Sequence, residues 1–249
     1  MAHSASTRRN PYKTRFFNEF AELIETSGWQ RAYDYIEELC SQTGDHGPAW
    51  EMRGLLASEV GESEQAVRSL ENASLLVALE PVSSRTLALE YIRLGRRGLG
   101  IDLLHSLGME DHIESALLRL LAQDLCRLGK PTLAVDCLAS RLSFEREDAA
   151  LWHDLSAAQT ASGLAKERCL DSARRAIALA PSVTEFRVTA SLLLIHLDRP
   201  DEAYHLVTEL PAAAIRQIDC PCCLWRLICL FDCYNDRARA RLCYDLLSA

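Results

Sequence analysis

The sequence lacks the features that would place it in a membrane or in a secreted class. Among its 249 residues, no window approaches about eighteen uncharged apolar residues, so no transmembrane helix is expected. The polar start of the chain, Met1 to Lys13, is not followed by the apolar stretch that a secretory signal requires. We therefore expect a cytoplasmic protein with no membrane partner, and its ten cysteines are expected to be reduced thiols.

The motifs of common enzyme classes are also missing. Neither phosphate-binding glycine loop, GxxxxGK[ST] or GxGxxG, occurs, and there is no HExxH metal pair or GxSxG turn. The acidic pairs Glu37–Glu38 and Glu145–Glu147 lie among other charges, which favours a solvated helix surface over acid–base catalysis. A net charge of −8 gives no general attraction to phosphate backbones. We expect no catalysis, no cofactor and no nucleic-acid partner.

The sequence does contain an internal period of 34 residues, the step from Gly61 to Gly95. Between the glycines lie stretches of about a dozen residues with apolar positions three and four apart, the spacing of a buried helical face. A second column of small residues recurs with the same step. Four positions before each of them stands a third column, in which most residues are bulky. The three columns are Gly61, Gly95, Gly129 and Gly163; Gly54, Ala88, Ala122, Ser156 and Ala190; and Trp50, Ser84, Leu118, Trp152 and Phe186.

These columns predict a stack of helical hairpins. The small residues let neighbouring helices approach closely, and the bulky residue fills the space beside them. We expect the glycines of the first column in the turns inside the hairpins. Trp50 and Trp152 are expected to be largely buried between helices, because a covered ring of that size stabilises the fold by a few kcal/mol.

The pattern resembles the tetratricopeptide repeat, which has a Trp, a Leu-Gly pair and a Tyr on its first helix and an Ala, a Phe and a late Pro afterwards. Arg53 stands where that pattern has Leu, and only Tyr91 supplies the tyrosine ring. The resemblance covers most of the chain and implies an all-α solenoid, a right-handed superhelix of about seven helix-turn-helix repeats. The residues that carry it best are Trp50, Gly54, Ala66, Leu70, Ala73 and Pro81.

The period also predicts the organisation of the chain. We expect a flexible polar N-terminal tail at residues 1–12, followed by one repeat array at residues 13–249. The outer units match the pattern least, as is common where a terminal repeat has no neighbour on one face. The units are expected at residues 13–46, 47–80, 81–114, 115–148, 149–183, 184–218 and 219–249.

Basic residues at repeat-matched positions favour a binding groove. In the fold that the resemblance implies, the first helices of successive units line the concave face. We expect no acidic residue on this face in the three central units, so that the groove holds an acidic or C-terminal peptide of a partner protein, as carboxylate-clamp domains do. Alternatively, the arginines cover apolar surface or pair with carboxylates of adjacent helices. The expected groove residues are Arg85, Arg93, Arg119, Gln123, Arg127, His153 and Arg187.

Six of the ten cysteines lie in the last thirty residues. They contain no second CxxC pair beside Cys220 and Cys223, as a zinc knuckle site would need, and buried free cysteines behave as small hydrophobic residues, so we expect core packing and no metal. A metal- or redox-responsive protein remains an alternative, with Cys220, Cys222, Cys223, Cys229 and Cys233 as the ligand candidates.

The last unit is also rich in apolar residues. A second alternative is therefore a self-associating scaffold that forms a homodimer through this unit. The residues expected at that contact are Trp225, Phe231, Tyr244 and Leu247. The sequence as a whole predicts a non-catalytic scaffold or adaptor for protein binding.

Overall fold

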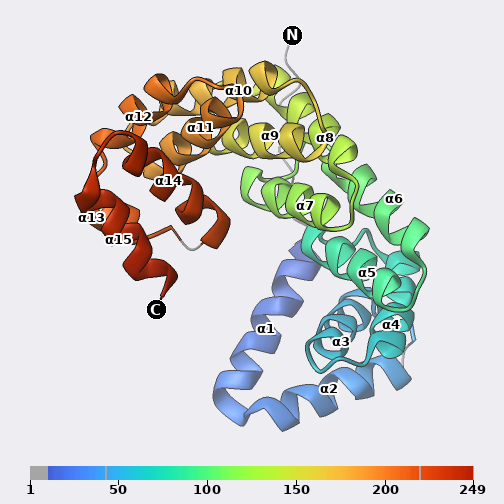
Figure 1. Cartoon of the computed structure of the whole chain (residues 1–249). Coiled ribbons are helices and arrows are strands. Elements are labelled where there is room, and N and C mark those ends of the chain that lie inside the picture. The colour runs from blue at the N-terminus through green and yellow to red at the C-terminus, as the bar shows by residue number, and fades with distance from the viewer. Residues whose placement is uncertain (1–10, 43, 219, 249) are drawn as a thin grey trace. The chain divides into compact units, whose positions relative to one another are not determined.

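The computed structural model describes residues 11–42, 44–218 and 220–248, and in this part of the chain it contains fifteen helices and no strand (Figure 1). The predicted all-α solenoid of helical hairpins is confirmed. The helices follow one another as α1 (Pro11–Ser27) and α2 (Trp29–Gln42), α3 (Gly47–Glu59) and α4 (Ser63–Leu76), α5 (Pro81–Arg93) and α6 (Arg97–Gly108), α7 (Ser115–Arg127) and α8 (Pro131–Phe144), α9 (Ala149–Ala161) and α10 (Lys166–Leu179), α11 (Thr184–His196) and α12 (Pro200–Thr208), the short α13 (Ala212–Ile215), and α14 (Pro221–Cys233) and α15 (Arg237–Leu247).

The chain divides into two compact units, one ending at Leu117 and the other beginning at Leu118. The sequence pattern, in contrast, predicts one array. Helix α1 begins at Pro11, two residues before the predicted start of the array, and residues 1–10 of the predicted tail lie outside the described residues. Among the helices described, none combines the length and the apolar character that a bilayer crossing requires.

The hairpins turn at residues with left-handed backbone conformation. Gly61 and Gly95 have φ values of 83° and 78°, and Gly129 and Gly163 have 72° and 75°, so the turn positions expected from the 34-residue step are confirmed. After each of these glycines, the next N–H donates to a carbonyl in the last turn of the preceding helix, as Glu62 does to Ala57 at 2.9 Å. This is the Schellman arrangement, in which glycine has no steric penalty.

The last two hairpins use short polar residues at the same turn position. Asp198 follows α11 with φ of 57°, and Asn235 follows α14 with φ of 55°. Asp and Asn tolerate the left-handed conformation better than other residues with a Cβ. These hairpins therefore keep the turn although the glycine column of the sequence ends at Gly163.

The helices of a hairpin approach one another most closely at the small-residue column. A Cβ on Gly54 would lie 2.6 Å from Cγ of Leu70 on α4, and a Cβ on Gly100 of α6 would lie 2.4 Å from the carbonyl oxygen of Ala88. Ser156, which is fully buried, donates a 2.7 Å hydrogen bond to the carbonyl of Cys169 on α10. A larger side chain at these positions would force the two helices apart.

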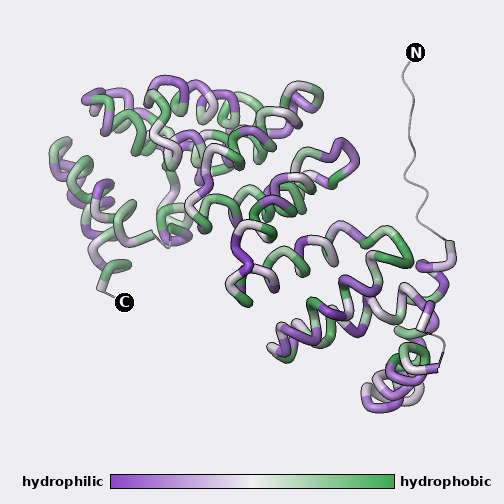
Figure 2. The backbone as a smooth tube through the Cα atoms, turned by 90° about the vertical axis from the view of Figure 1, so that its right-hand side faces the viewer, coloured by the Kyte–Doolittle hydropathy of each residue, from purple (hydrophilic) through white to green (hydrophobic). Residues whose placement is uncertain are grey.

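The core consists mainly of aliphatic side chains. Leu70, Leu104 and Leu138 are fully buried and recur at the 34-residue step on α4, α6 and α8. Hydrophobic and hydrophilic segments are interleaved along the backbone (Figure 2). On α2 the buried residues Ala32, Ile36 and Cys40 recur four positions apart and so share one face of the helix, as the sequence spacing predicts.

Trp50 and Trp152 are partly buried: neither side chain is fully covered, and neither is exposed. Each indole N–H donates to a backbone carbonyl six residues earlier, Trp50 to Gly44 at 3.0 Å and Trp152 to Arg146 at 2.9 Å. The polar edge of the ring thus holds it beside the loop that enters its helix, because a buried indole N–H needs a partner. The sequence pattern identifies the position but not this hydrogen bond.

We expect Gly100→Ala to lower the free energy of unfolding by about 1–3 kcal/mol, because the new methyl group would meet the Ala88 carbonyl and the Ile92 side chain. Gly98 is the matched control, since it lies in the same helix with open space around it. Gly98→Ala should raise stability by about 0.5–1 kcal/mol through helix propensity. Urea unfolding followed by circular dichroism measures both changes, and equal shifts of the two midpoints would contradict the close approach.

Candidate functional site

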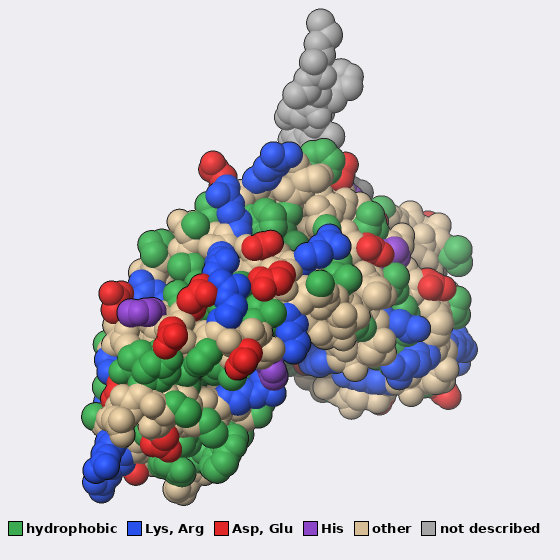
Figure 3. Space-filling model, turned by 45° about the horizontal axis from the view of Figure 1, so that its top comes forward, with side chains coloured by type: hydrophobic (Ala, Val, Ile, Leu, Met, Phe, Trp, Pro, Cys, Tyr) green, Lys and Arg blue, Asp and Glu red, His purple; other side chains and the backbone are tan. Residues whose placement is uncertain are grey.

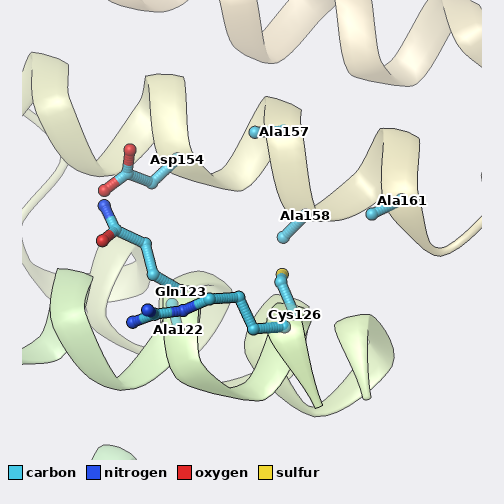
Figure 4. A pocket seen from close by; sticks show the side chains of 8 residues that line it. Ala122, Gln123, Cys126, Asp154, Ala157, Ala158 and Ala161 are labelled. Atoms are coloured by element: carbon cyan, nitrogen blue, oxygen red, sulfur yellow. The ribbon is translucent and has the colours of Figure 1, made fainter. Parts of the chain in front are cut away.

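Helices α7 and α9 border an open hollow of about 550 Å³ in the unit that begins at Leu118. Figure 4 shows Gln123 extending from α7 toward Asp154 on α9, and the sulfur of Cys126 pointing toward Ala158. Alanines form most of the α9 wall, which leaves the space that longer side chains would fill. The residues that line the hollow are Ala122, Gln123, Cys126, Arg127, Asp154, Ala157, Ala158 and Ala161.

A chain of polar contacts beside the hollow joins α7, α9 and α11. Nε of Arg119 donates to Oδ2 of Asp154 at 2.6 Å. The other carboxylate oxygen of Asp154 lies 3.4 Å from Nδ1 of His153, and Nε2 of His153 lies 3.0 Å from the hydroxyl of Thr189 on α11. The His153 ring stacks on Phe186 with centroids 4.9 Å apart. These contacts connect the first helices of three successive repeats.

Asp154 is the central charged group of this chain. Burial acts to raise the pKa of its carboxyl, but the nearby His153 ring and the hydrogen bond and charge of Arg119 outweigh burial and hold the pKa below the usual aspartate value. The side chain of Asp154 is 11% exposed, whereas that of Arg119 is 38% exposed. Asp154 is therefore ionised at neutral pH, and the solvent-facing side of its partner guanidinium remains accessible.

The prediction that no acidic residue interrupts this face is wrong, because the carboxylate of Asp154 lines the hollow. Arg127 forms an ion pair with Asp124, three residues earlier on α7, and Arg187 lies 3.5 Å from Glu209. Asp124 is almost fully buried and Glu209 is highly exposed. The spacing of three residues between Asp124 and Arg127 is a helical ion-pair signal that the sequence already contains. On much of this face the arginines therefore pair with carboxylates of the same array, which is the alternative stated in the sequence analysis.

Arginines and carboxylates are also close neighbours elsewhere on the molecule. On the face drawn in Figure 3, cationic and anionic side chains lie interspersed in many places. In the unit that ends at Leu117, Arg93 pairs with Glu90, which is nearly fully buried on the same helix. Glu51, one repeat before Arg85, is fully buried and forms a 2.7 Å ion pair with Lys13 of α1. This repeat position is therefore structural in α3.

The predicted groove residues divide between the two units. The structure brings Arg119, Gln123 and Arg127 together on α7 and places His153 beside them on α9. Arg187 lies on α11 next to Phe186, which His153 contacts. The other two, Arg85 and Arg93, lie on α5 in the unit that ends at Leu117. Asp154 is the main residue that the sequence pattern missed, since its position does not recur as an acid at the 34-residue step.

The C-terminal cysteines do not pack as predicted. Cys222, Cys229 and Cys233 are exposed and Cys220 and Cys223 are half-buried, so core packing is wrong for these five. The sulfur atoms of Cys220, Cys222 and Cys223 lie within 4.8 Å of one another, whereas Cys229 and Cys233 lie outside this cluster. The α14 positions that face the core are instead filled by larger apolar residues, among them Leu224 and Leu227.

Cys243 on α15 does follow the prediction of core packing. It is fully buried, and burial raises the pKa of its thiol to about 11. Such a thiol stays protonated and unreactive at neutral pH.

The apolar residues of the last hairpin differ in exposure. Trp225 and Tyr244 are exposed and pack edge to face, with ring centroids 6.5 Å apart. Leu247 is half-buried. Phe231 is fully buried in the core between α11, α12, α14 and α15, so its predicted place at a contact surface is wrong. A ring at this core-facing position of α14 stabilises the hairpin and has no accessible surface for a partner.

Comparison with known proteins relates the fold to solved structures. No protein-family model and no curated protein matches the chain. The C-terminal part of a TPR repeat-containing protein from Cytophaga hutchinsonii has a TM-score of 0.65 at 11% identity, with 93% of each chain covered. MamA from Desulfovibrio magneticus, residues 41 to the end, has a TM-score of 0.52 at 15% identity, over 67% of this chain and 93% of that one.

A third solved structure is YrrB, described as a TPR protein with an unusual peptide-binding site. It has a TM-score of 0.50 at 14% identity, over 70% of this chain and 93% of that one. Together, these similarities show that the chain has the tetratricopeptide-repeat fold that its sequence resembles.

We expect Asp154→Asn to lower the free energy of unfolding by about 1–3 kcal/mol at pH 7, because it removes the charge that pairs with Arg119. A carboxyl with a lowered pKa stabilises the fold above its unfolded pKa of about 3.9, and this contribution is lost as the pH falls through the lower folded pKa. The stability difference between the two proteins should therefore shrink below about pH 4.

The control is Glu209→Gln, which removes the exposed partner of Arg187 and should change stability by less than about 0.5 kcal/mol. Denaturant unfolding at a series of pH values measures both variants. A constant difference between the native chain and Asp154→Asn from about pH 7 to pH 3 would contradict the role of the charged carboxylate.

Proposed function

We propose that this chain is a non-catalytic scaffold or adaptor that binds an acidic or C-terminal peptide segment of a partner protein along α7 and α9. The observation that carries the proposal is the hollow beside α7, which is lined mainly by small residues together with Gln123, Arg127 and the carboxylate of Asp154. Pockets for peptides and small ligands combine an apolar lining with a few placed polar groups in this way.

The spacing of the polar groups on α7 fits an extended peptide. Arg119 and Arg127 are eight residues apart on one helix, which corresponds to about 12 Å, and Gln123 lies midway between them. About four residues of an extended chain span that distance. The amide of Gln123 can donate to and accept from a peptide backbone, while the two guanidinium groups suit carboxylates. The hollow between them can accept an apolar side chain.

The ion pairs already present are compatible with this role. A guanidinium group has several N–H donors in a planar fork, so a hydrogen bond to one carboxylate leaves donors for a second. The side chain of Arg127 is 69% exposed and that of Arg119 is 38% exposed, while their partners Asp124 and Asp154 are nearly buried. The nearly buried carboxylates therefore hold the two arginines at the surface, with part of each guanidinium group facing solvent.

The binding test uses a fluorescent eight-residue peptide that is rich in Asp and Glu and ends in a free carboxylate, with an Asn/Gln version that is amidated at its C-terminus for comparison. Fluorescence anisotropy should show about tenfold tighter binding of the acidic peptide, and the difference should shrink in about 0.5 M salt. Ala157→Glu should weaken its binding by about tenfold or more, because a second carboxylate would then stand in the hollow beside Asp154, which is already paired with Arg119.

Two control variants separate the effect of the added charge on binding from the effects of side-chain size and of position. Ala157→Gln has nearly the same size as Ala157→Glu and should weaken binding less than about threefold. Ala178→Glu adds the same charge at an exposed position of α10 and should leave binding unchanged. Equal affinity for the two peptides would contradict the proposal, and so would an equal effect of the Glu substitutions at Ala157 and Ala178 on the binding of the acidic peptide.

A second candidate function is self-association through the last hairpin. It is favoured by the exposure of Trp225 and Tyr244, which are 55% and 44% exposed. Two large rings in edge-to-face contact offer an apolar surface of the kind that protein contacts use. A two-fold dimer that pairs this surface with its own copy is the simplest closed arrangement.

For this candidate we expect the native chain to sediment as a dimer at micromolar concentration and Trp225→Asp to sediment as a 27.8 kDa monomer. The control is Trp29→Asp, since Trp29 is 60% exposed on α2 in the other unit and should not affect the dimer. A native chain that sediments at 27.8 kDa would rule out self-association.

A further inference from the structure

Three cysteines converge at the start of α14. The sulfur atoms of Cys220, Cys222 and Cys223 all lie within 4.8 Å of one another, and those of Cys220 and Cys222 are 3.0 Å apart. Cys222 is exposed and the other two are half-buried, so the cluster opens to solvent. No other group of at least three Cys, His, Asp or Glu residues converges in this way in the part of the chain that the structure describes.

The local sequence explains why the three thiols meet. Cys220 is the N-cap residue of α14, with extended backbone, and Pro221 occupies the first helical position, where its fixed φ favours helix initiation. The side chain of an N-cap residue lies beside the second and third helical residues. In this helix those residues are Cys222 and Cys223, so the capping geometry itself brings the sulfurs together.

We propose that Cys220, Cys222 and Cys223 form a three-thiolate binding site for a soft metal ion, with Cu(I) as the ion that the site fits best. A metal about 2.3 Å from each of three sulfurs places the sulfurs about 4 Å apart, which the observed cluster already approaches. Thiolates select soft ions such as Cu(I), and structural zinc requires four ligands.

The position of the cluster suits the charge of such a site. Three thiolates around a monovalent ion carry a net negative charge, and the N-terminal end of a 13-residue helix offers unpaired N–H groups and a positive dipole end. A cation also lies one turn along the same helix, since Arg226 follows Cys222 by four residues. The site is independent of the proposed peptide groove, because α7 and α9 contribute no residue to it.

The test uses the full-length chain, purified reduced and without oxygen, and titrated with Cu(I) against bicinchoninate as the competing ligand. We expect one Cu(I) per chain, with X-ray absorption showing about three sulfur neighbours at about 2.3 Å. Cys222→Ser should lower the affinity by at least about tenfold. The control is Cys229→Ser with Cys233→Ser, which removes two exposed thiols of the same helix and should leave the affinity unchanged.

Circular dichroism establishes that each variant retains its helices. If a folded chain with all three cluster cysteines changed to serine binds Cu(I) as tightly as the native chain, the site is wrong. The assignment to a soft monovalent ion fails if the native chain binds Zn²⁺ in preference to Cu(I). A Cys220–Cys222 disulfide that persists in the presence of Cu(I) and a thiol reductant would likewise overturn the proposal.

Discussion

The close contact between the two helices of each hairpin is the constraint on which the rest of the structure depends. At Gly54 and Gly100 the neighbouring helix lies so near that a single added carbon would collide with it. Such a contact sets the distance between the helices, and the large aliphatic residues then fill the space on either side. Close contacts at the small-residue column occur in the α3–α4, α5–α6 and α9–α10 hairpins, which therefore share one way of packing their two helices. Repeat-matched residues on α7 and α9 face one another across a common surface.

Where a feature depends on local sterics, the sequence is sufficient to predict it. The glycine column predicts the left-handed turns because glycine adopts that conformation without penalty, and the small-residue column predicts the close contacts. The columns also predict the buried leucines on α4, α6 and α8. The turns at Asp198 and Asn235 could not be predicted in the same way, because a turn position filled by a polar residue leaves no glycine to align.

The candidate sites were less predictable because they depend on contacts between elements. The sequence identifies Arg119 and Gln123 from the period, but Asp154 lies outside the recurring columns and its link to Arg119 exists only in the folded array. Trp50 shows a related limit, since the period predicts a bulky residue but not that its N–H would reach a loop carbonyl. For Cys220, the absence of a second CxxC pair pointed away from a metal site, whereas capping geometry brings its sulfur to the neighbouring thiols.

The buried carboxylates beneath the arginines have a consequence for selectivity. Asp154 and Asp124 are held next to Arg119 and Arg127 by the fold. Each carboxylate therefore competes with a ligand's carboxylate for its arginine at a high effective concentration. A free ligand with one carboxylate gains little by displacing or sharing such a partner, because one ion pair is exchanged for another. A segment with several neighbouring anionic groups engages both guanidinium groups at once and gains from their linkage. The face therefore responds to the density of negative charge along a ligand, rather than to negative charge as such.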